Sequence, residues 1–251
     1  MLSKTAQTVS KCEFPPLMLG CSPFIGAGQF GFKALVYYER FSLNPENMVR
    51  LFLRSFEFGV KAVQLLGDRP IDALLRAVEI SGVKPFVIYS TDSSGVRLRR
   101  VLKRLEPLRV EYVAVHAEVA DRRDVDRVME RLKILREYGV SGAIATHKPG
   151  LTLPWVEREN LPVDVVLMPL NSVGYAMDPD FTSSIKAIKE CSRRVVAIKP
   201  LAAGRLHPAE AFRFVYRYAD SAAVGIASEE EMKETFEAAL KAYDKAHRSK
   251  G

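Results

Sequence analysis

Short apolar runs alternate with longer amphipathic segments along almost the whole chain, and this alternation limits the possible folds more than any other feature. Eight runs are rich in β-branched residues and nearly continuous in hydrophobicity, as strands covered on both faces must be. They span residues 16–24, 61–66, 85–91, 111–119, 141–147, 163–171, 194–202 and 221–226. Segments of helical periodicity lie between them, at 45–58, 70–81, 94–106, 122–138, 180–192, 208–218 and 228–246, and a weaker helix is expected after Pro154. Eight strand–helix units, at a spacing of roughly 30 residues, predict a (β/α)8 barrel.

Residues that start and stop helices lie at the ends of these segments. Prolines suited to a first helical turn begin four of them, and glycines suited to a left-handed cap follow three. The prolines are Pro45, Pro70, Pro179 and Pro208, and the glycines are Gly59, Gly82 and Gly139. Ser228 precedes three glutamates, which is typical of an N-cap with acidic side chains in the first turn.

An open, doubly wound sheet is the alternative architecture. Its first strand would lead into a glycine-rich turn that opens a helix. The sequence LGCSPFIGAGQFG contains several glycines but no GxGxxG match, and a stretch without helical periodicity follows it. We therefore expect one barrel domain over residues 1–251, with an N-terminal extension at 1–15 and a long first loop at 25–44.

Composition excludes several classes of protein. With 251 residues, 48% of them hydrophobic and 27% charged, the chain is neither disordered nor fibrous. Its three cysteines have no CxxC spacing, which argues against a zinc site or a disulfide scaffold. No apolar run approaches the roughly 18 residues of a membrane helix, and the first residues lack the apolar core of a signal peptide, so we expect a cytoplasmic protein without a membrane partner. Asparagine and glutamine are scarce, as is typical of thermophile proteins.

The net charge of +7 raises the question of a nucleic-acid partner. The basic residues are scattered among acids at helical spacing, as in RRDVDRVMERLKILRE. The densest cluster, between Arg97 and Arg104 on one expected helix, has no interleaved aromatic residues. A solvated helix face is therefore the favoured interpretation, and no nucleic-acid partner is expected.

In a (β/α)8 barrel the active site lies at the carboxyl ends of the strands and in the loops that follow them. Polar residues suited to chemistry stand at these predicted ends. They are Ser22, the 26–38 loop, Gln64, Asp68, Tyr89, Ser90, Asp92, His116, Glu118, Thr146, His147, Lys148, Asn171, Lys199, Arg205 and Ser228. We expect a small-molecule site among them.

Two segments of the final third, VVAIKPLAAGRLHPAEAFRF and SAAVGIASEEEMKETFEAAL, resemble the seventh and eighth strand units of the aldo-keto reductase superfamily. In that family a proline-leucine-glycine loop and the cap of the last helix hold the phosphates of a nicotinamide dinucleotide. The resemblance therefore implies a (β/α)8 barrel that binds NADP(H) through Pro200, Leu201, Gly204, Arg205 and Ser228.

The middle of the chain resembles the family more loosely. EYVAVHAEVAD lies where the family has its catalytic histidine, which implies a catalytic role for His116. GVSGAIATHKPG lies where the family has a serine- or threonine-containing loop, and DVVLMPLN ends in Asn171, where some branches also have an asparagine. The resemblance thus adds Thr146, His147 and Asn171 to the expected cofactor site.

Three of the four catalytic residues of the family's reductases, the Asp, the Tyr and the Lys, are not matched. Gln64 falls at the Asp position, Ser90 or Thr91 falls at the Lys position, and the loop that carries the Tyr is shortened. Carbonyl reduction by hydride needs a proton donor, and a phenol beside a cation supplies it. A phenol from Tyr37 or Tyr38 on the long first loop is a hypothetical replacement.

Other chemistry stays open. His116, Glu118, His147 and Asp68 are a set of nitrogen and oxygen ligands for a divalent metal, although no HxH or HxxxH spacing supports it. Lys199, at the end of the seventh strand, is suited to Schiff-base chemistry because desolvation in a barrel interior lowers a lysine pKa. The alternative for Lys199 is an ammonium group that binds a ligand phosphate or carboxylate.

The loops after the seventh and eighth strands are the usual phosphate site of such barrels. Gly204, Arg205 and the helix opened by Ser228 predict phosphate binding here, whereas the three glutamates at 229–231 weigh against a strongly anionic ligand.

Three hypotheses follow. The first is an oxidoreductase-like barrel that binds NADP(H) without the standard tetrad, with His116, Gln64 and Lys199 as its catalytic residues. The second is a lyase or metal-dependent hydrolase that acts on a phosphorylated or acidic small molecule. The third is a catalytically silent barrel.

Overall fold

Eight parallel strands form a closed barrel in the computed structural model, which describes residues 14–91, 95–108 and 110–248. The strands are β1 (Leu17–Gly20), β2 (Ala62–Leu66), β3 (Phe86–Ser90), β4 (Tyr112–Val115), β5 (Ser141–Ala145), β6 (Val165–Pro169), β7 (Arg194–Ile198) and β8 (Ser221–Gly225). Each strand pairs with the next one in sequence, and β8 closes the ring on β1, with Leu17 opposite Ala222 and Gly20 opposite Gly225. The predicted (β/α)8 barrel is confirmed, and the open sheet is wrong.

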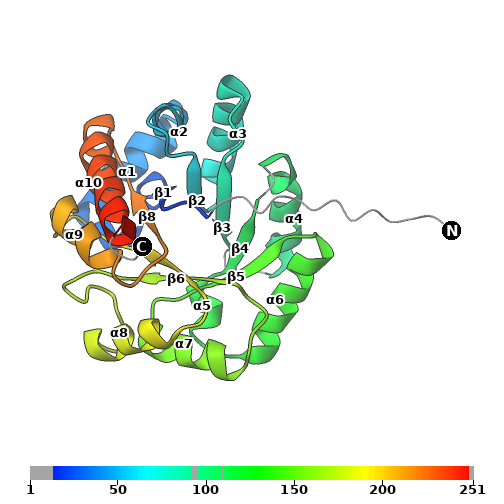
Figure 1. The fold of residues 1–251 in the computed structure, drawn as a ribbon. Coiled ribbons are helices and arrows are strands. Elements are labelled where there is room, and N and C mark those ends of the chain that lie inside the picture. Colours follow the sequence, from blue (N-terminus) through cyan, green and yellow to red (C-terminus); the bar gives the residue numbers. More distant parts are fainter. Residues whose placement is uncertain (1–13, 92–94, 109, 249–251) are drawn as a thin grey trace.

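Ten α-helices are present in the described part of the chain, and Figure 1 shows them arranged around the strands. They are α1 (Phe32–Tyr38), α2 (Glu46–Glu57), α3 (Arg69–Ser81), α4 (Gly95–Leu105), α5 (Ala117–Ala120), α6 (Val125–Glu137), α7 (Pro149–Arg158), α8 (Phe181–Glu190), α9 (Pro208–Val215) and α10 (Glu229–Arg248). The weak helix expected after Pro154 is α7, which begins five residues earlier and contains Pro154. Within the described ranges, no helix combines the length and the apolar character needed to cross a membrane.

Side chains alternate in direction along each strand, so the apolar residues form two cores, one between strands and helices and one inside the barrel. On β1, Leu17 and Leu19 face outward and pack in the layer between strands and helices, whereas Met18 faces the barrel interior. The interior core continues with the inward residues of the other strands, among them Phe86 and Ile88 of β3. Because successive side chains point to opposite faces, the next inward positions, Gln64 on β2 and Ser90 on β3, lie one layer above this apolar plug.

Several predicted strands are longer than the observed ones because the chain turns as soon as it leaves the barrel. A 3-10 helix (Pro23–Ile25) follows β1, the short helix α5 follows β4, and left-handed residues follow β7. The predictions of strands at 16–24, 111–119 and 194–202 are therefore wrong at their carboxyl ends. Runs of apolar residues do not reveal where pairing stops.

The first loop is largely helical rather than irregular. It contains two 3-10 helices, α1 and a π-helical turn (Glu39–Leu43). Two buried aromatic contacts anchor its ends, since the Phe24 ring lies 4.7 Å from Phe41 and 5.4 Å from Phe52 of α2. The sequence shows no helical periodicity here because α1 has only seven residues, too few to show a repeat. Residues 1–13 of the expected N-terminal extension lie outside the described residues.

Gly26 fixes the approach of this loop to the barrel. Its φ of +61° is left-handed, and a Cβ placed there would lie 2.7 Å from the Ala34 carbonyl oxygen of α1. We expect Gly26→Ala to lower the free energy of unfolding by about 2–4 kcal/mol, because strain and overlap with backbone add. Gly28→Ala is the control, since nothing lies within 4 Å of its Cβ position. Equal urea midpoints for the two variants would contradict this account.

Candidate active site

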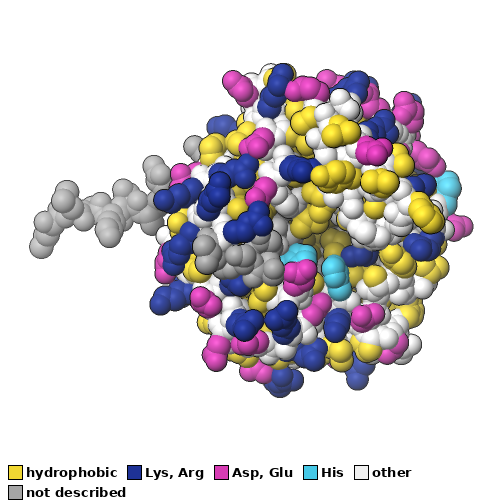
Figure 2. Space-filling model, turned by 180° about the vertical axis from the view of Figure 1, so that it is seen from behind, with side chains coloured by type: hydrophobic (Ala, Val, Ile, Leu, Met, Phe, Trp, Pro, Cys, Tyr) yellow, Lys and Arg dark blue, Asp and Glu magenta, His cyan; other side chains and the backbone are white. Residues whose placement is uncertain are grey.

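A cavity of about 570 Å³ opens at the carboxyl end of the barrel. It exists because four residues at the upper inward positions of the strands are small. These are Gly20, Ala145, Ala223 and Gly225. Their missing side-chain volume leaves space of the size that a small-molecule ligand occupies. Figure 2 shows the hollow from outside, with apolar walls and histidine side chains at its edge.

An uncharged pair stands on the floor of the cavity. Gln64 and Ser90 are both buried, and Gln64 Nε2 donates a hydrogen bond to Ser90 Oγ over 3.1 Å. These are the positions at which the resemblance places an aspartate and a lysine. Replacing an ion pair by an amide and a hydroxyl removes the cation that would lower the pKa of a phenol. The floor therefore carries uncharged hydrogen-bonding groups in place of an ion pair.

His116 does not share a strand face with Glu118, because β4 ends at Val115. His116 is the extended N-cap of α5, and its Nδ1 accepts a hydrogen bond from the Glu118 backbone N–H over 3.3 Å. Its own backbone N–H donates to Thr91 Oγ1. In the neutral ring this arrangement leaves Nε2 as the protonated nitrogen. The ring lines the cavity, as the sequence predicts for a catalytic group.

Asp121 organises the loop after β5, and strand-end reasoning did not find it because it follows α5. Its Oδ1 accepts from the hydroxyls of Thr146 and Thr152, and its Oδ2 accepts from the His147 backbone N–H over 2.9 Å. Thr146 is therefore buried in a structural network and does not line the cavity.

His147 does line the cavity, and its ring centroid lies 6.1 Å from that of His116. Removal from bulk water, together with the positive charges of Lys199 and His116, lowers the pKa of His147 to about 4. The ring is accordingly neutral at pH 7 and can accept a proton.

Lys199 follows β7 on a strained backbone with a φ of +52°. Its side chain is largely withdrawn from water and lines the cavity, and burial lowers the pKa of Lys199 to about 8. Among the described residues no carboxylate forms an ion pair with its ammonium group. A left-handed lysine costs about 1–3 kcal/mol and persists only where its surroundings impose it.

Asn171 is one of the groups that impose this conformation. It is fully buried, and its Nδ2 donates to the carbonyl oxygens of Lys199 and Tyr175, while its Oδ1 accepts from the Tyr175 N–H. All of its polar atoms are thus used on backbone, and it is absent from the cavity wall. Asn171 positions Lys199.

The loop after β7 is a compact turn. Ala202 and Ala203 also have positive φ, and Gly204 follows them with a φ of +85°. Pro200, Leu201 and Gly204 line the cavity as predicted. Arg205 is exposed instead, since its guanidinium donates to the Ala202 carbonyl over 2.7 Å and lies 4.3 Å from the centroid of the Tyr175 ring.

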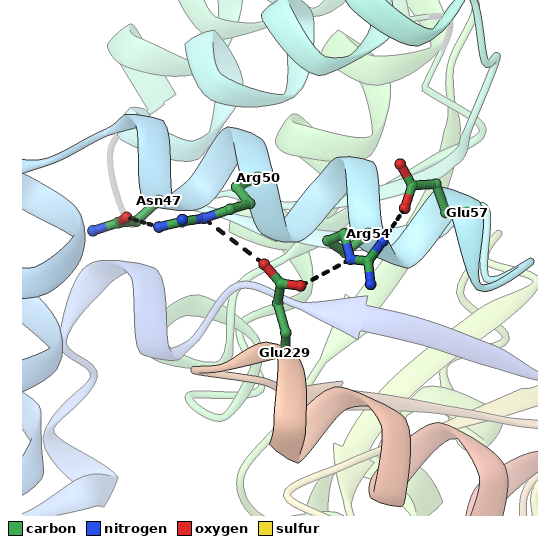
Figure 3. A network of polar contacts seen from close by, with 5 residues as sticks. All are labelled: Asn47, Arg50, Arg54, Glu57 and Glu229. Atoms are coloured by element: carbon green, nitrogen blue, oxygen red, sulfur yellow. Dashed lines mark hydrogen bonds and ion pairs between the residues drawn. The ribbon is translucent and has the colours of Figure 1, made fainter.

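The N-terminus of α10 is closed by the chain's own carboxylate. Ser228 Oγ accepts from the Glu231 N–H over 3.2 Å, and Glu231 Oε2 accepts from the Ala227 N–H over 2.8 Å, which together resemble a capping box. Glu231 lines the cavity, and burial raises the pKa of its carboxyl group. Glu229 points the other way and bridges Arg50 and Arg54 of α2 (Figure 3).

Of the eleven residues predicted as catalytic or cofactor-binding, seven line the cavity and four do not. Those on its wall are Gln64, His116, His147, Lys199, Pro200, Leu201 and Gly204. Those not on its wall are Thr146, Asn171, Arg205 and Ser228. Of the two candidate phenols, Tyr37 lines this cavity and Tyr38 does not. Asp92 lies outside the described residues.

The described part of the chain contains no set of side chains arranged to bind a metal ion. No group of three or more histidine, cysteine, aspartate or glutamate side chains there is placed to hold an ion. Asp68 is instead ion-paired with Arg97 over 2.9 Å.

Comparisons with known proteins support the fold. No family model matches the sequence, and no curated protein matches it. Among solved structures, a Pseudomonas aeruginosa protein assigned as an aldo-keto reductase superposes with a TM-score of 0.65 over 90% of both chains, at 18% identity. The thermostable aldo-keto reductase Tm1743 gives 0.64 over 95% of this chain and 96% of its own, at 12% identity. A thiamine phosphate pyrophosphorylase from Pyrococcus furiosus gives 0.55 over 79% and 90%, at 14% identity.

These likenesses confirm the predicted resemblance to aldo-keto reductases at the level of the fold. The chain thus has a (β/α)8 barrel whose fold is similar to that of aldo-keto reductases.

The positioning role of Asn171 can be tested by stability. Asn171→Ala removes three hydrogen bonds to partly buried backbone groups; it leaves the Tyr175 N–H and carbonyl without their partner, while the Lys199 carbonyl keeps the Ala202 N–H. We expect the free energy of unfolding to fall by about 2–3 kcal/mol. Asn44→Ala is the matched control, because Asn44 is exposed. The measurement is urea denaturation of both variants, and a shift no larger for Asn171→Ala than for Asn44→Ala would refute the role.

Proposed function

We propose that this chain is a lyase that binds a small carbonyl compound as a Schiff base on Lys199. The observation that carries the proposal is the placement of Lys199, withdrawn from water, without an ion-pair partner among the described residues, on the wall of the cavity beside His147. A neutral lysine amine in a desolvated pocket is the nucleophile that such chemistry requires.

The residues present account for each proton in the first step. The Lys199 nitrogen attacks the carbonyl carbon, and the π-electron pair of the carbonyl group moves to its oxygen. Neutral His147 carries one proton from the nitrogen to the oxygen, which gives a carbinolamine that keeps one N–H. A second proton, taken from water and delivered by the same imidazole, converts the hydroxyl group into water, which leaves as the nitrogen lone pair forms the C=N bond of the protonated imine. The step releases one water molecule and requires no oxidant or reductant.

The protonated imine then withdraws electrons from the adjacent carbon–carbon bond. In a β-hydroxy compound the bond between the α and β carbons breaks, its electron pair forms the C=C bond of an enamine, and the π-electron pair of the C=N bond moves to nitrogen. The hydroxyl proton passes to an imidazole, the β carbon leaves as a carbonyl compound, and the imidazole then returns the proton to the α carbon. His147 and His116 are the imidazoles that line the cavity, and the Gln64–Ser90 pair provides hydrogen bonds for ligand hydroxyl groups. Water later releases the remaining fragment and restores the amine.

Borohydride trapping tests the proposal. Glyceraldehyde with sodium cyanoborohydride should leave a permanent adduct on Lys199, located by peptide mass spectrometry. With a pKa of about 8, Lys199 carries roughly 300-fold more neutral amine at pH 7 than an ordinary lysine. The rate should therefore rise with pH and level off above pH 8.

Two variants complete this experiment. Lys199→Arg keeps the positive charge but cannot form an imine, so the adduct should disappear. Lys148→Arg changes an exposed lysine near the same loops and should leave the adduct unchanged. Labelling of Lys199 no faster than that of surface lysines would exclude Schiff-base chemistry.

The nicotinamide dinucleotide implied by the resemblance fits these residues poorly. Its phosphates would need the N–H groups and positive end of α10, but Glu231 and Ser228 already accept hydrogen bonds from two N–H groups there, those of Ala227 and Glu231. The second carboxylate of that turn, Glu229, faces the arginines of α2 (Figure 3). A diphosphate would have to displace Glu231 and then lie beside the remaining acidic side chains. We therefore favour the lyase over the NADP(H)-dependent oxidoreductase.

Calorimetric titration separates the two functions. We expect no binding heat from NADPH or NADH at millimolar concentration, because the capping box must break before a phosphate can approach. The same preparation should label in the trapping reaction, which shows that its site is intact. Micromolar binding of NADPH would reverse the preference and favour a reductase.

A further inference from the structure

A second cavity of about 420 Å³ adjoins the first one. The two share Ile25, Leu66 and His116 in their walls, so the His116 ring stands between them. Tyr89, which faces outward from β3, lines only the second cavity. The second cavity therefore lies beside the barrel mouth, near the carboxyl ends of β2 and β3, and not inside the ring of strands.

Arg69 is a fixed cation in this second cavity. Its guanidinium lies 5.0 Å from the centroid of the Tyr38 ring, and its Nη2 donates to the Tyr38 hydroxyl over 3.1 Å. These two contacts hold the group in one orientation at little further entropic cost. No carboxylate of the described residues forms an ion pair with Arg69.

The neighbouring charges leave this arginine uncompensated. Asp68, the nearest carboxylate in sequence, pairs with Arg97 over 2.9 Å and lies 3.9 Å from Arg104. Glu118 also lines the cavity, and its side chain, like that of Arg69, is exposed, so that water screens both charges; Glu118 forms no ion pair with Arg69. A guanidinium with unused N–H groups matches a phosphate or a carboxylate in geometry as well as in charge.

We propose that the second cavity binds the anionic end of the substrate through Arg69. This inference rests on the proposed function, because it places the carbonyl end of the same molecule at Lys199. The substrate class is then a small carbonyl compound that carries a phosphate or carboxylate group at its other end. His116, in the wall between the two cavities, would face the middle of such a molecule.

The test uses probes that cannot form an imine, so that it does not depend on Lys199. Glycerol 3-phosphate, glycerate and glycerol are titrated calorimetrically into the unmodified protein, Arg69→Gln and Arg76→Gln. Arg76 lies on the same helix and pairs with Glu46, away from both cavities. We expect at least one of the two anions to bind, and Arg69→Gln to weaken it by about tenfold or more. Arg76→Gln should bind like the unmodified protein.

The outcomes distinguish this inference from the proposed function. A phosphate-bearing substrate is indicated if only glycerol 3-phosphate binds, and a carboxylate-bearing one if only glycerate binds. Equal affinity of Arg69→Gln and the unmodified protein for the anion would overturn the inference, as would binding of glycerol as tight as that of both anions. If borohydride trapping fails but an anion still binds in a way that depends on Arg69, the proposed lyase function is wrong and the anion site stands. Thermal melting of each variant checks that the fold is unchanged.

Discussion

Closure of the barrel between β1 and β8 is the constraint on which the rest of the structure depends. Parallel strands bonded in a ring bring all eight carboxyl ends to one rim, so residues far apart in sequence become neighbours. Gln64 and Ser90, on β2 and β3, meet in this way, and Lys199 after β7 reaches the cavity that His116 borders after β4. The interior below them is packed with apolar side chains and provides a rigid floor.

The site concentrates the departures from ordinary packing. Small residues at the rim leave a cavity where large ones would add buried apolar contact, and a lysine without an ion-pair partner among the described residues stands on left-handed backbone. Buried hydrogen bonds compensate locally, since Asn171 ties the Lys199 carbonyl and Asp121 ties the loop that carries His147. Unfavourable local conformations that the surrounding structure maintains are typical of functional sites.

Periodicity predicted the barrel and the positions of its strands, because buried parallel strands and amphipathic helices leave distinct patterns. The same topology predicted that Gln64, His116, His147 and Lys199 would share one cavity. It could not show that Asn171 bonds only to backbone, because that depends on the path of the loop after β6.

Other features of the site could not be predicted from the sequence, for different reasons. The turn of His116 into α5 depends on one hydrogen bond to Glu118, which no pattern reveals. Glu231 follows Ser228 by three residues, so the capping box was readable as a motif, but its presence in the cavity wall required the fold. The orientation of Arg69 likewise depends on its contact with Tyr38, thirty-one residues away in the sequence, which no sequence pattern indicates.

The distribution of charge around the rim gives the remaining argument about the ligand. At the β8 side Glu231 and Ser228 accept hydrogen bonds from two N–H groups at the N-terminus of α10, so the chain's own side chains already use part of its positive end. At the β2 side Arg69 keeps its charge without an ion-pair partner among the described residues. Because a bound anion is stabilised where positive charge is not already neutralised, the anionic group of a ligand is better accommodated beside Arg69 than at the N-terminus of α10. The barrel thus resembles that of aldo-keto reductases in fold, whereas the ligand that we propose for it would place its anionic group at the β2 side of the rim.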